Sequence, residues 1–196
     1  GAITLTGATR IGAVAGTLTL NGVVGGAGQN LTVGGAGNVT IAGGIGTTTG
    51  SLTKDGTGTT NLTGAHTYSG TTTISGGTLS IGNKTATGSL GSGAVTNDGT
   101  LQISRSNVIT VSNDISGTGA LTKLQTNVAT LTGTNTYSGT TTISAGTLNI
   151  GGGGATGTLG TGAVVNSGTL LIDRTDAALT VANNISGAGA LTKSAA

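Results

Sequence analysis

The feature that most constrains the fold is a long internal repeat. Residues 64–82 (GAHTYSGTTTISGGTLSIG) recur at 133–151 as GTNTYSGTTTISAGTLNIG, an offset of 69. An L-T-K triplet ends at Lys54, Lys123 and Lys193, at intervals of 69 and 70. Self-similarity at a fixed period is typical of proteins in which each unit packs only on its neighbours. The chain is therefore expected to form a repeat architecture.

A shorter unit, G-T-L-x-[apolar], lies twice inside each long repeat. It occurs at 77–81, 99–103, 146–150 and 168–172, and its internal step is 22 both times. Each long repeat is therefore expected to hold three coils of about 23 residues, a length that suits a parallel β-solenoid. Equivalent lysines would then recur every third coil, about 14 Å apart at the usual strand spacing.

Apolar residues two positions apart indicate strands with one buried side. Such pairs are Leu79 and Ile81, Leu101 and Ile103, Ile109 and Val111, and Leu179 and Val181. Thr, Ser, Asn and Gln fill most positions between them, and no helix signal is present. Gly76-Gly77 and Asn113-Asp114 are expected to supply corners with a positive φ angle.

These patterns predict an all-β, right-handed parallel β-helix with about 22 to 23 residues per coil and about nine coils. The expected organisation is as follows: less regular N-terminal coils over 1–50, a first three-coil repeat over 51–120, a second over 121–190, and the start of a further coil over 191–196. Stacking at about 4.8 Å per coil gives a rod of about 43 Å.

The composition argues against several other classes of protein. The chain has 41 Gly among its 196 residues and no Pro, Cys, Met, Trp or Phe. It lacks the G-X-Y period of collagen, and its ordered Leu, Ile and Val positions are unlike a flexible linker. Charged residues make up only 6% and the net charge is +2, so no basic footprint for nucleic acid is present. No stretch is long and apolar enough to cross a bilayer.

The segment NTYSGTTTISAGTL at 135–148 resembles the autotransporter-associated β-strand repeat of very large Gram-negative autotransporter proteins. The pieces NDGTLQI, NNISGAGALTK and LTGTNTYSG are similar to that family as well, and the resemblance extends over 51–193. It implies a β-helical passenger stalk exported through an outer-membrane barrel, with stepwise folding outside the cell assisting secretion. The motif specifies a type of repeat and no activity. Because neither a signal peptide nor a barrel is found, the chain is expected to be a segment of a longer passenger or part of a related extracellular fibre.

Acidic residues give no support to a polysaccharide-cleaving enzyme, a class that also uses β-helices. Such sites need converging carboxylates or a metal. The chain has no Glu, and its five acids are scattered over different coils. They are Asp55, Asp98, Asp114, Asp173 and Asp176. We expect them to be turn or surface residues, which Asp favours.

The single imidazole, His66, excludes a multi-His zinc site and leaves a catalytic triad without support. Its counterpart one repeat later is Asn135. We expect His66 to be a solvated corner residue and not a general base.

Two further pairs of residues are related by the same offset of 69. Tyr68 and Tyr137 are expected to close coil corners, and the alternative is a pair of exposed rings that stack on sugars or on a partner. Arg105 and Arg174 are expected to be surface charges.

Other sequence features suggest loops and an irregular surface. The glycine-rich stretches at 25–28 and 151–157 lack a Walker lysine and a following helix, so they are expected to be loops and not phosphate cradles. Ice binding would require a regular T-x-T array on successive coils. The expected outward pairs, such as Thr78 with Ser80 and Thr100 with Gln102, do not form one.

No catalytic, cofactor-binding or metal site is therefore expected. The favoured function is a non-catalytic scaffold, a passenger-type stalk of a bacterial surface or adhesin protein. The alternative is a self-assembling extracellular filament whose open solenoid ends stack. A polysaccharide-active enzyme and an ice-binding solenoid are less favoured. Expected partners are neighbouring β-helical segments of the same or identical chains and a glycan or protein ligand of unknown identity, without nucleic acid or direct membrane insertion. The expected location is extracellular, at the bacterial surface.

Overall fold

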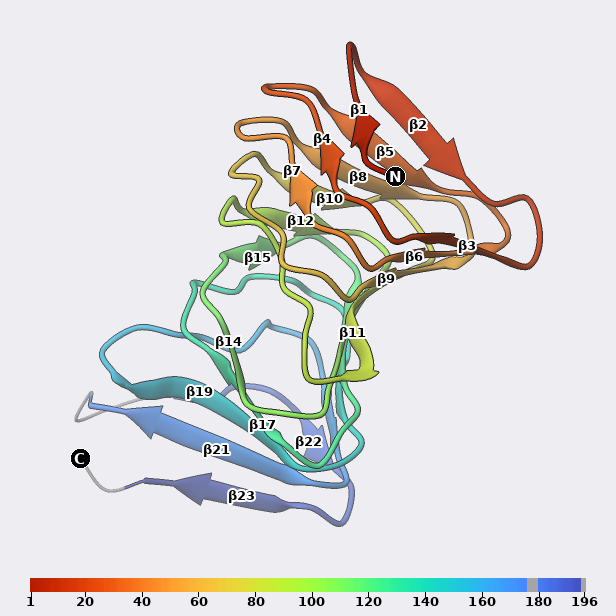
Figure 1. Ribbon diagram of the computed structural model, residues 1–196. Helices are drawn as coiled ribbons and strands as arrows, with labels where there is room; N and C mark the ends of the chain where they lie inside the picture. Colours follow the sequence, from red (N-terminus) through yellow and green to blue (C-terminus); the bar gives the residue numbers. More distant parts are fainter. Residues whose placement is uncertain (176–179, 195–196) are drawn as a thin grey trace.

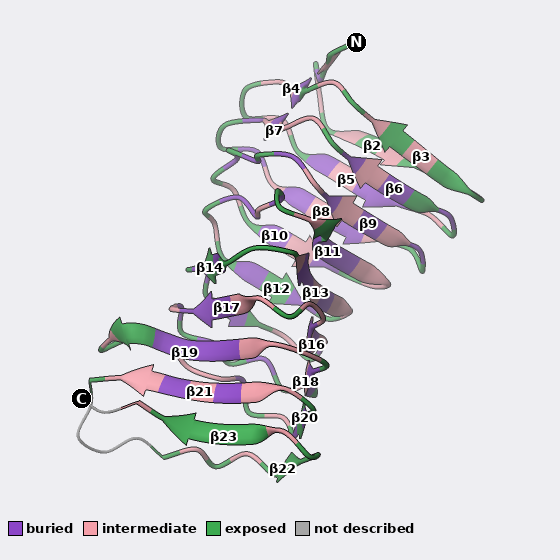
Figure 2. Cartoon of the chain, turned by 60° about the horizontal axis from the view of Figure 1, so that its bottom comes forward, coloured by how far each residue is buried: buried purple, intermediate pink, exposed green. Residues whose placement is uncertain are grey.

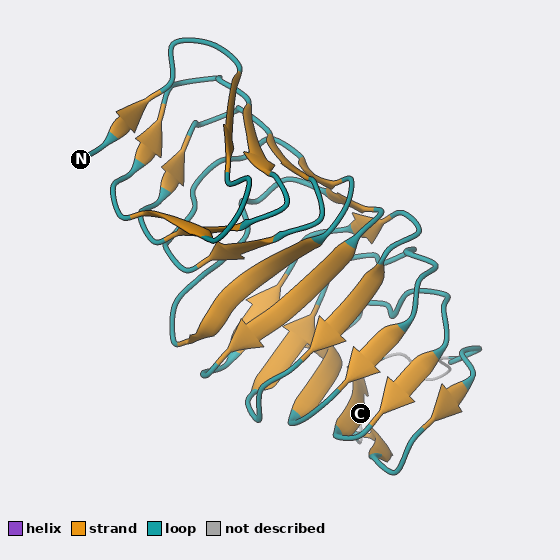
Figure 3. Ribbon diagram, turned by 90° about the vertical axis from the view of Figure 1, so that its right-hand side faces the viewer, coloured by secondary structure: helices purple, strands orange, loops and turns teal. Residues whose placement is uncertain are grey.

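Parallel strands stack into a β-solenoid of about nine turns in the computed structural model of the protein (Figure 1). The structure describes residues 1–175 and 180–194. Within these residues it contains strands, turns and loops but no helix, as Figure 3 shows. The N-terminal strands lie at one end of the stack and the C-terminal strands at the other. The fold class predicted from the repeats is confirmed.

Each coil visits three faces in turn, and every pair of neighbouring strands is parallel. The six-stranded face contains β2 (Thr9–Gly12), β5 (Leu31–Gly34), β8 (Leu52–Asp55), β10 (Thr72–Ile74), β12 (Val95–Asn97) and β15 (Ile115–Ser116). The nine-stranded face contains β3 (Thr17–Leu20), β6 (Asn38–Ile41), β9 (Thr59–Leu62), β11 (Thr78–Thr85), β13 (Thr100–Arg105), β16 (Ala120–Lys123), β18 (Thr141–Ile143), β20 (Val164–Asn166) and β22 (Ile185–Ser186).

The third face consists of two separate sheets. The first contains β1 (Ile3–Thr4), β4 (Val24–Gly25) and β7 (Ile45–Gly46). The second contains β14 (Ile109–Val111), β17 (Val128–Leu131), β19 (Thr147–Gly154), β21 (Thr169–Arg174) and β23 (Ala190–Lys193). Between the two sheets, main-chain hydrogen bonds from Thr67 to Ile45 and from Ser92 to Tyr68 continue the stack without regular strands.

The strand register shows that the long repeat exceeds three coils. On the six-stranded face, Leu52 pairs with Thr72, Thr72 with Val95, and Val95 with Ile115. Three coils therefore lead from Leu52 to Ile115, a step of 63 in the numbering, which is shorter than the repeat offset of 69. The remaining residues of the repeat carry the chain across one more face. The sequence predicts three coils per repeat, and this expectation is wrong. Each repeat makes three coils and then crosses one further face, because the corners take fewer residues than assumed.

Equivalent strands of successive repeats consequently lie on different faces. The strand that contains the L-T-K triplet is β8 on the six-stranded face, then β16 on the nine-stranded face, then β23 on the third face. Each repeat thus turns its sequence by one face about the solenoid axis. Three such repeats would complete ten coils.

The core is a set of aliphatic ladders in which like residues stack between coils. Leu79 pairs with Leu101 and Leu101 with Leu121, and all three are fully buried. Ile81 and Ile103 stack beside them. Figure 2 shows this burial along the strands, with the last strand, β23, exposed. The expected inward pairs on β11, β13 and β14 are confirmed. Val181 is only half-buried and lies in no strand, and Leu179 lies outside the described residues.

Two local expectations are wrong. Gly77 has the expected positive φ of 61°, but Asn113 and Asp114 do not, and Asn113 shapes its corner through side-chain hydrogen bonds. Ser80, expected to face outward, is buried beneath the loop that follows. Its hydroxyl donates to the Gly82 carbonyl at 2.8 Å.

The ladder architecture makes inward and outward positions respond differently to charge. We expect Leu101→Asp to lower the free energy of unfolding by more than about 4 kcal/mol, because it buries an unpaired carboxylate. Thr96→Asp, on an exposed position of β12, should stay within about 0.5 kcal/mol. Chemical denaturation followed by circular dichroism measures both. Equal effects of the two substitutions would contradict the assigned strand orientation.

Candidate functional site: the polar corners of the solenoid

The side chains that the repeats share gather at the corners, inside the solenoid. Lys54 is fully buried, and its Nζ donates hydrogen bonds to the carbonyl oxygens of Asp55 at 2.7 Å, Gly56 at 3.0 Å and Gly76 at 3.1 Å. These carbonyls belong to two successive coils. The ammonium therefore joins adjacent corners and satisfies main-chain groups that the strand ladders leave over.

The equivalent lysine repeats this arrangement on another face. Lys123 is also fully buried, and its Nζ donates to the carbonyls of Gln125 and Ala145 and to Oδ1 of Asn127 at 2.9 Å. Burial lowers the pKa of Lys123 to about 8. Burial also lowers the pKa of Lys54, and the nearby Asp55 partly opposes that effect.

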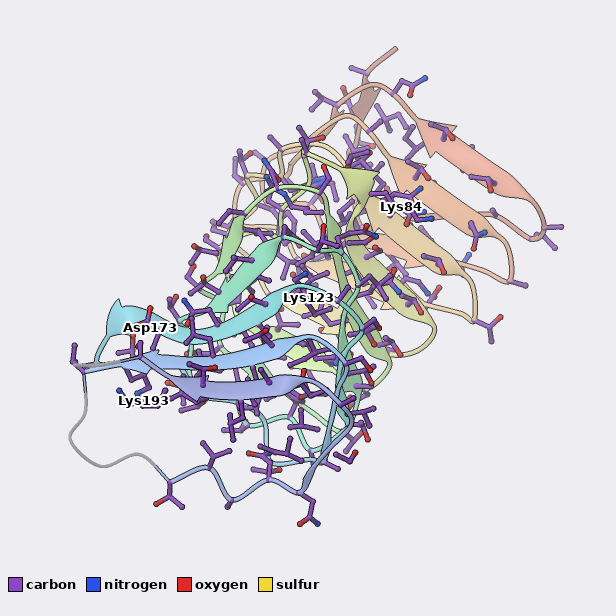
Figure 4. All side chains as sticks on the ribbon, turned by 90° about the horizontal axis from the view of Figure 1, so that it is seen from below. Lys84, Lys123, Asp173 and Lys193 are labelled. Carbon is purple, nitrogen blue, oxygen red and sulfur yellow. The ribbon has the colours of Figure 1, made fainter. Side chains whose placement is uncertain are left out.

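The third equivalent lysine lies where no further described coil covers it. Lys193, in the last described coil, is exposed and donates to the carbonyls of Arg174 and Ser194. In Figure 4, Lys123 lies within the body of the stack, whereas Lys193 lies at its end close to Asp173. The expectation of equivalent lysines stacked every third coil is wrong, since Lys54 and Lys123 point inward and each repeat turns by one face.

The two tyrosines close their corners, as the sequence predicts. Tyr68 and Tyr137 are fully buried, and their hydroxyl groups share hydrogen bonds with Thr72 at 2.8 Å and Thr141 at 2.7 Å. Burial raises the pKa of both phenols. The Tyr68 ring lies directly on Gly91, where a Cβ atom would overlap the ring carbons and the Tyr68 carbonyl oxygen. Neither ring is available to stack on a ligand.

His66 is buried and not solvated as expected. Its exposure is 6%, and its Nδ1 accepts a hydrogen bond of 3.0 Å from the Ile45 main-chain N–H. The ring is therefore neutral with its proton on Nε2. Among the described residues, Nε2 has no hydrogen-bond partner. Burial lowers the pKa of His66 to about 4.

Asn135 fulfils the same role one repeat later with every polar side-chain atom paired. Its Oδ1 accepts from the Ile115 N–H at 3.1 Å, and its Nδ2 donates to the carbonyls of Gly133 and Thr158. The side chain at this position thus accepts the main-chain N–H of the preceding coil in both repeats. His66 is a structural substitute for asparagine, and its own main-chain N–H donates to the Ser89 hydroxyl at 3.2 Å.

Arg105 and Arg174 each hold a loop that leaves the coil. Arg105 donates to the carbonyls of Ala86 at 2.7 Å and Gly88 at 3.0 Å, in the loop 82–88. Arg174 donates to the carbonyls of Ala155 and Gly157 in the equivalent loop 151–157. The expectation that both are simple surface charges is therefore wrong. The bases of the two loops are held alike, whereas their tips differ.

The aspartates lie at turns and edges, as expected. Oδ1 of Asp98 accepts the Thr118 N–H at 2.9 Å, and Asp114 accepts the Thr134 N–H. Asp55 forms an ion pair with Arg10 at 2.8 Å. Asp173 accepts hydrogen bonds from Ser194 and Asn149, and Asp176 lies outside the described residues. Within 1–175 and 180–194, no three His, Cys, Asp or Glu residues group together as a metal site would require.

Comparison with known families identifies the repeat. The family model of the passenger-associated-transport-repeat matches residues 52–81 and 121–150. The chain carries autotransporter passenger repeats. Each matched segment runs from the L-T-K strand through the tyrosine corner to the G-T-L-x-I strand. No curated protein and no solved structure matches the chain. The described residues form no helix that would span a membrane.

The residues that the two passenger repeats share therefore build the corners of the solenoid. Its lysine, tyrosine and His66 or Asn135 position all bind main-chain or hydroxyl groups of neighbouring turns. The shared offset of 69 marks these residues in the sequence, but the burial of the lysines and of His66 was not predicted. The signal for burial was the alternation in L-T-K itself, since leucine and lysine are two positions apart and so point to the same side of the strand.

The buried ammonium is expected to stabilise the passenger repeat. Lys123→Met keeps the aliphatic stem but leaves the Gln125 and Ala145 carbonyls without a donor, which should lower the free energy of unfolding by about 3 kcal/mol. Lys84→Met is the matched control, because Lys84 is exposed near the irregular end of β11, and it should change stability by less than about 0.5 kcal/mol. Urea denaturation of both variants measures this. If Lys123→Met is as stable as the wild type, the hydrogen bonds of the ammonium contribute no stability.

The His66 corner is expected to weaken in acid. The unfolded chain binds a proton at about pH 6.5 and the folded chain only at about pH 4, so stability is complete above pH 6.5 and is lost as the pH falls to 4. The loss should approach about 3 kcal/mol. His66→Asn should match the wild type at pH 7.5 and be more stable than it at pH 4. Unfolding curves at the two pH values test this, and parallel acid sensitivity in both proteins would contradict it.

Proposed function

We propose that the chain is a non-catalytic extracellular scaffold, a rigid segment of a passenger stalk at the bacterial surface. The observation that carries this proposal is that the shared polar residues of the passenger repeat, Lys54 and Lys123, Tyr68 and Tyr137, point into the solenoid and bind its own corners. A residue used in this way stabilises the stack and is not presented to a substrate.

The passenger repeats themselves support export to the cell surface, because they belong to proteins whose stalks are displayed there. The absence of cysteine suits an oxidising compartment. The loops 82–88 and 151–157 are where such a stalk would tolerate variation, since the arginines fix only their bases.

A second candidate, an end-to-end filament, is favoured by one observation. Leu191 is 55% exposed and Ile185 36% exposed on the last described coil, whereas their counterparts Leu121 and Ile115 are fully buried. Another coil stacked there would cover this apolar edge. The coil could come from the same polypeptide or from another copy, and only the second case produces a filament.

Electron microscopy over a concentration series, combined with light scattering, separates the two candidates. The stalk proposal predicts isolated rods about 43 Å long with the mass of one 18.3 kDa chain. Concentration-dependent filaments would overturn it in favour of self-assembly. Leu191→Lys should then abolish the filaments, whereas Val165→Lys, on the side wall, should leave them intact.

A further inference from the structure

A cleft interrupts the wall of the solenoid on its third face. It lies between residues 89–92 and the strand β14, and its volume is about 390 Å³. Tyr68 and Leu90 contribute to its lining from one side, and Val108 and Thr110 from the other. Val108 is 63% exposed although it is apolar. The cleft marks the place where two successive coils do not pair.

The Asn113 side chain bridges the two walls at one end of the cleft. Asn113 donates from Nδ2 to the carbonyls of Gly91 at 2.8 Å and Gly93 at 2.7 Å. A side-chain amide here supplies the N–H donors that the next strand of a regular ladder would supply. The Gly91 and Gly93 carbonyls of this wall therefore point toward the cleft and accept amide donors.

The opposite wall is an open strand edge. β14 pairs only with β17, and the Thr132 N–H bonds to the Val111 carbonyl on that side. Alternate residues of a parallel strand direct their main-chain groups to opposite sides. The N–H and C=O of Thr110 therefore face the cleft, and within the described chain they have no main-chain partner.

The arrangement recurs one repeat later on a different face. A second cleft of about 340 Å³ is lined by residues 157–161 and 180–183, and Asn183 donates to the carbonyls of Gly160 and Gly162. The Thr136 N–H bonds to the Ile115 carbonyl of β15, which places this cleft on the continuation of the six-stranded face. The gap is thus built into the repeat.

We propose that the cleft beside β14 binds an extended peptide segment by strand addition. One wall presents the Gly91 and Gly93 carbonyls, which here accept the Asn113 amide, and the other presents the main-chain donor and acceptor of Thr110, the pattern that another strand complements. The buried Nε2–H of His66, which has no partner among the described residues, lies in the same lining. A saccharide fits less well, because the nearby Tyr68 ring is fully buried and cannot stack on a sugar.

NMR titration of the ¹⁵N-labelled 196-residue chain tests the proposal. The probe is a capped heptapeptide with the sequence of residues 127–133, NVATLTG, which includes the strand that pairs with the other edge of β14. We expect saturable shifts of the Thr110 amide and of the amides of residues 89–92. Two further probes carry N-methyl groups at alternate residues. One is methylated at the odd positions of the heptapeptide and the other at the even positions, so that each loses the N–H donors of one strand edge. One of these probes should bind about tenfold more weakly, since it loses two main-chain donors, and the other should bind like the parent.

The protein side of the test is Thr110→Pro, which removes the edge donor. It should abolish the peptide-induced shifts while amides distant from β14 keep their positions, which shows that the variant is folded. Equal binding of both methylated probes, or no shifts at millimolar peptide, would overturn the proposal. Shifts of the same amides with maltose and not with the peptide would assign the cleft to saccharides and overturn it as well.

Discussion

Main-chain hydrogen bonding between successive coils is the interaction on which the whole structure depends. Parallel ladders satisfy the backbone along the faces, but the chain must turn three times in every coil, and each turn leaves carbonyl and N–H groups outside the ladders. A chain with so little charge and almost no aromatic surface uses some of its few charged side chains and its asparagines for these positions. The buried ammonium of Lys54 and the amide of Asn135 are two solutions to the same problem.

Burial of a lysine is costly unless its charge is well coordinated. The corner provides that coordination, because carbonyl oxygens from two coils converge on one Nζ. The same carbonyls would be unsatisfied without the ammonium, so each group makes burial of the other tolerable. This mutual dependence explains why L-T-K persists in a sequence that otherwise avoids charge.

The fold could be predicted from the sequence because its signals are periodic. The alternation of apolar residues and the spacing of G-T-L-x-I define strands and coils without any tertiary information. The corner chemistry was harder to predict, since Lys54 and His66 belong to residue types that are usually exposed or intermediate. The rotation by one face was also missed, because an offset of 69 divides evenly by 23 and nothing in one sequence shows that three coils are shorter than the repeat. The cleft beside β14 depends on the absence of a strand pairing, for which the sequence contains no signal.

The rotation of the repeat also decides how a solenoid of this type presents its loops to its surroundings. The loops 82–88 and 151–157 include the irregular ends of β11 and β19, strands that lie on different faces. Any bulky molecule that approaches from one side, such as an antibody, meets an equivalent loop only after ten coils, about 48 Å along the axis at the usual strand spacing. A bulky molecule at one loop therefore does not crowd the loop of the next repeat, and shielding one side of the solenoid leaves the loops on its other faces accessible.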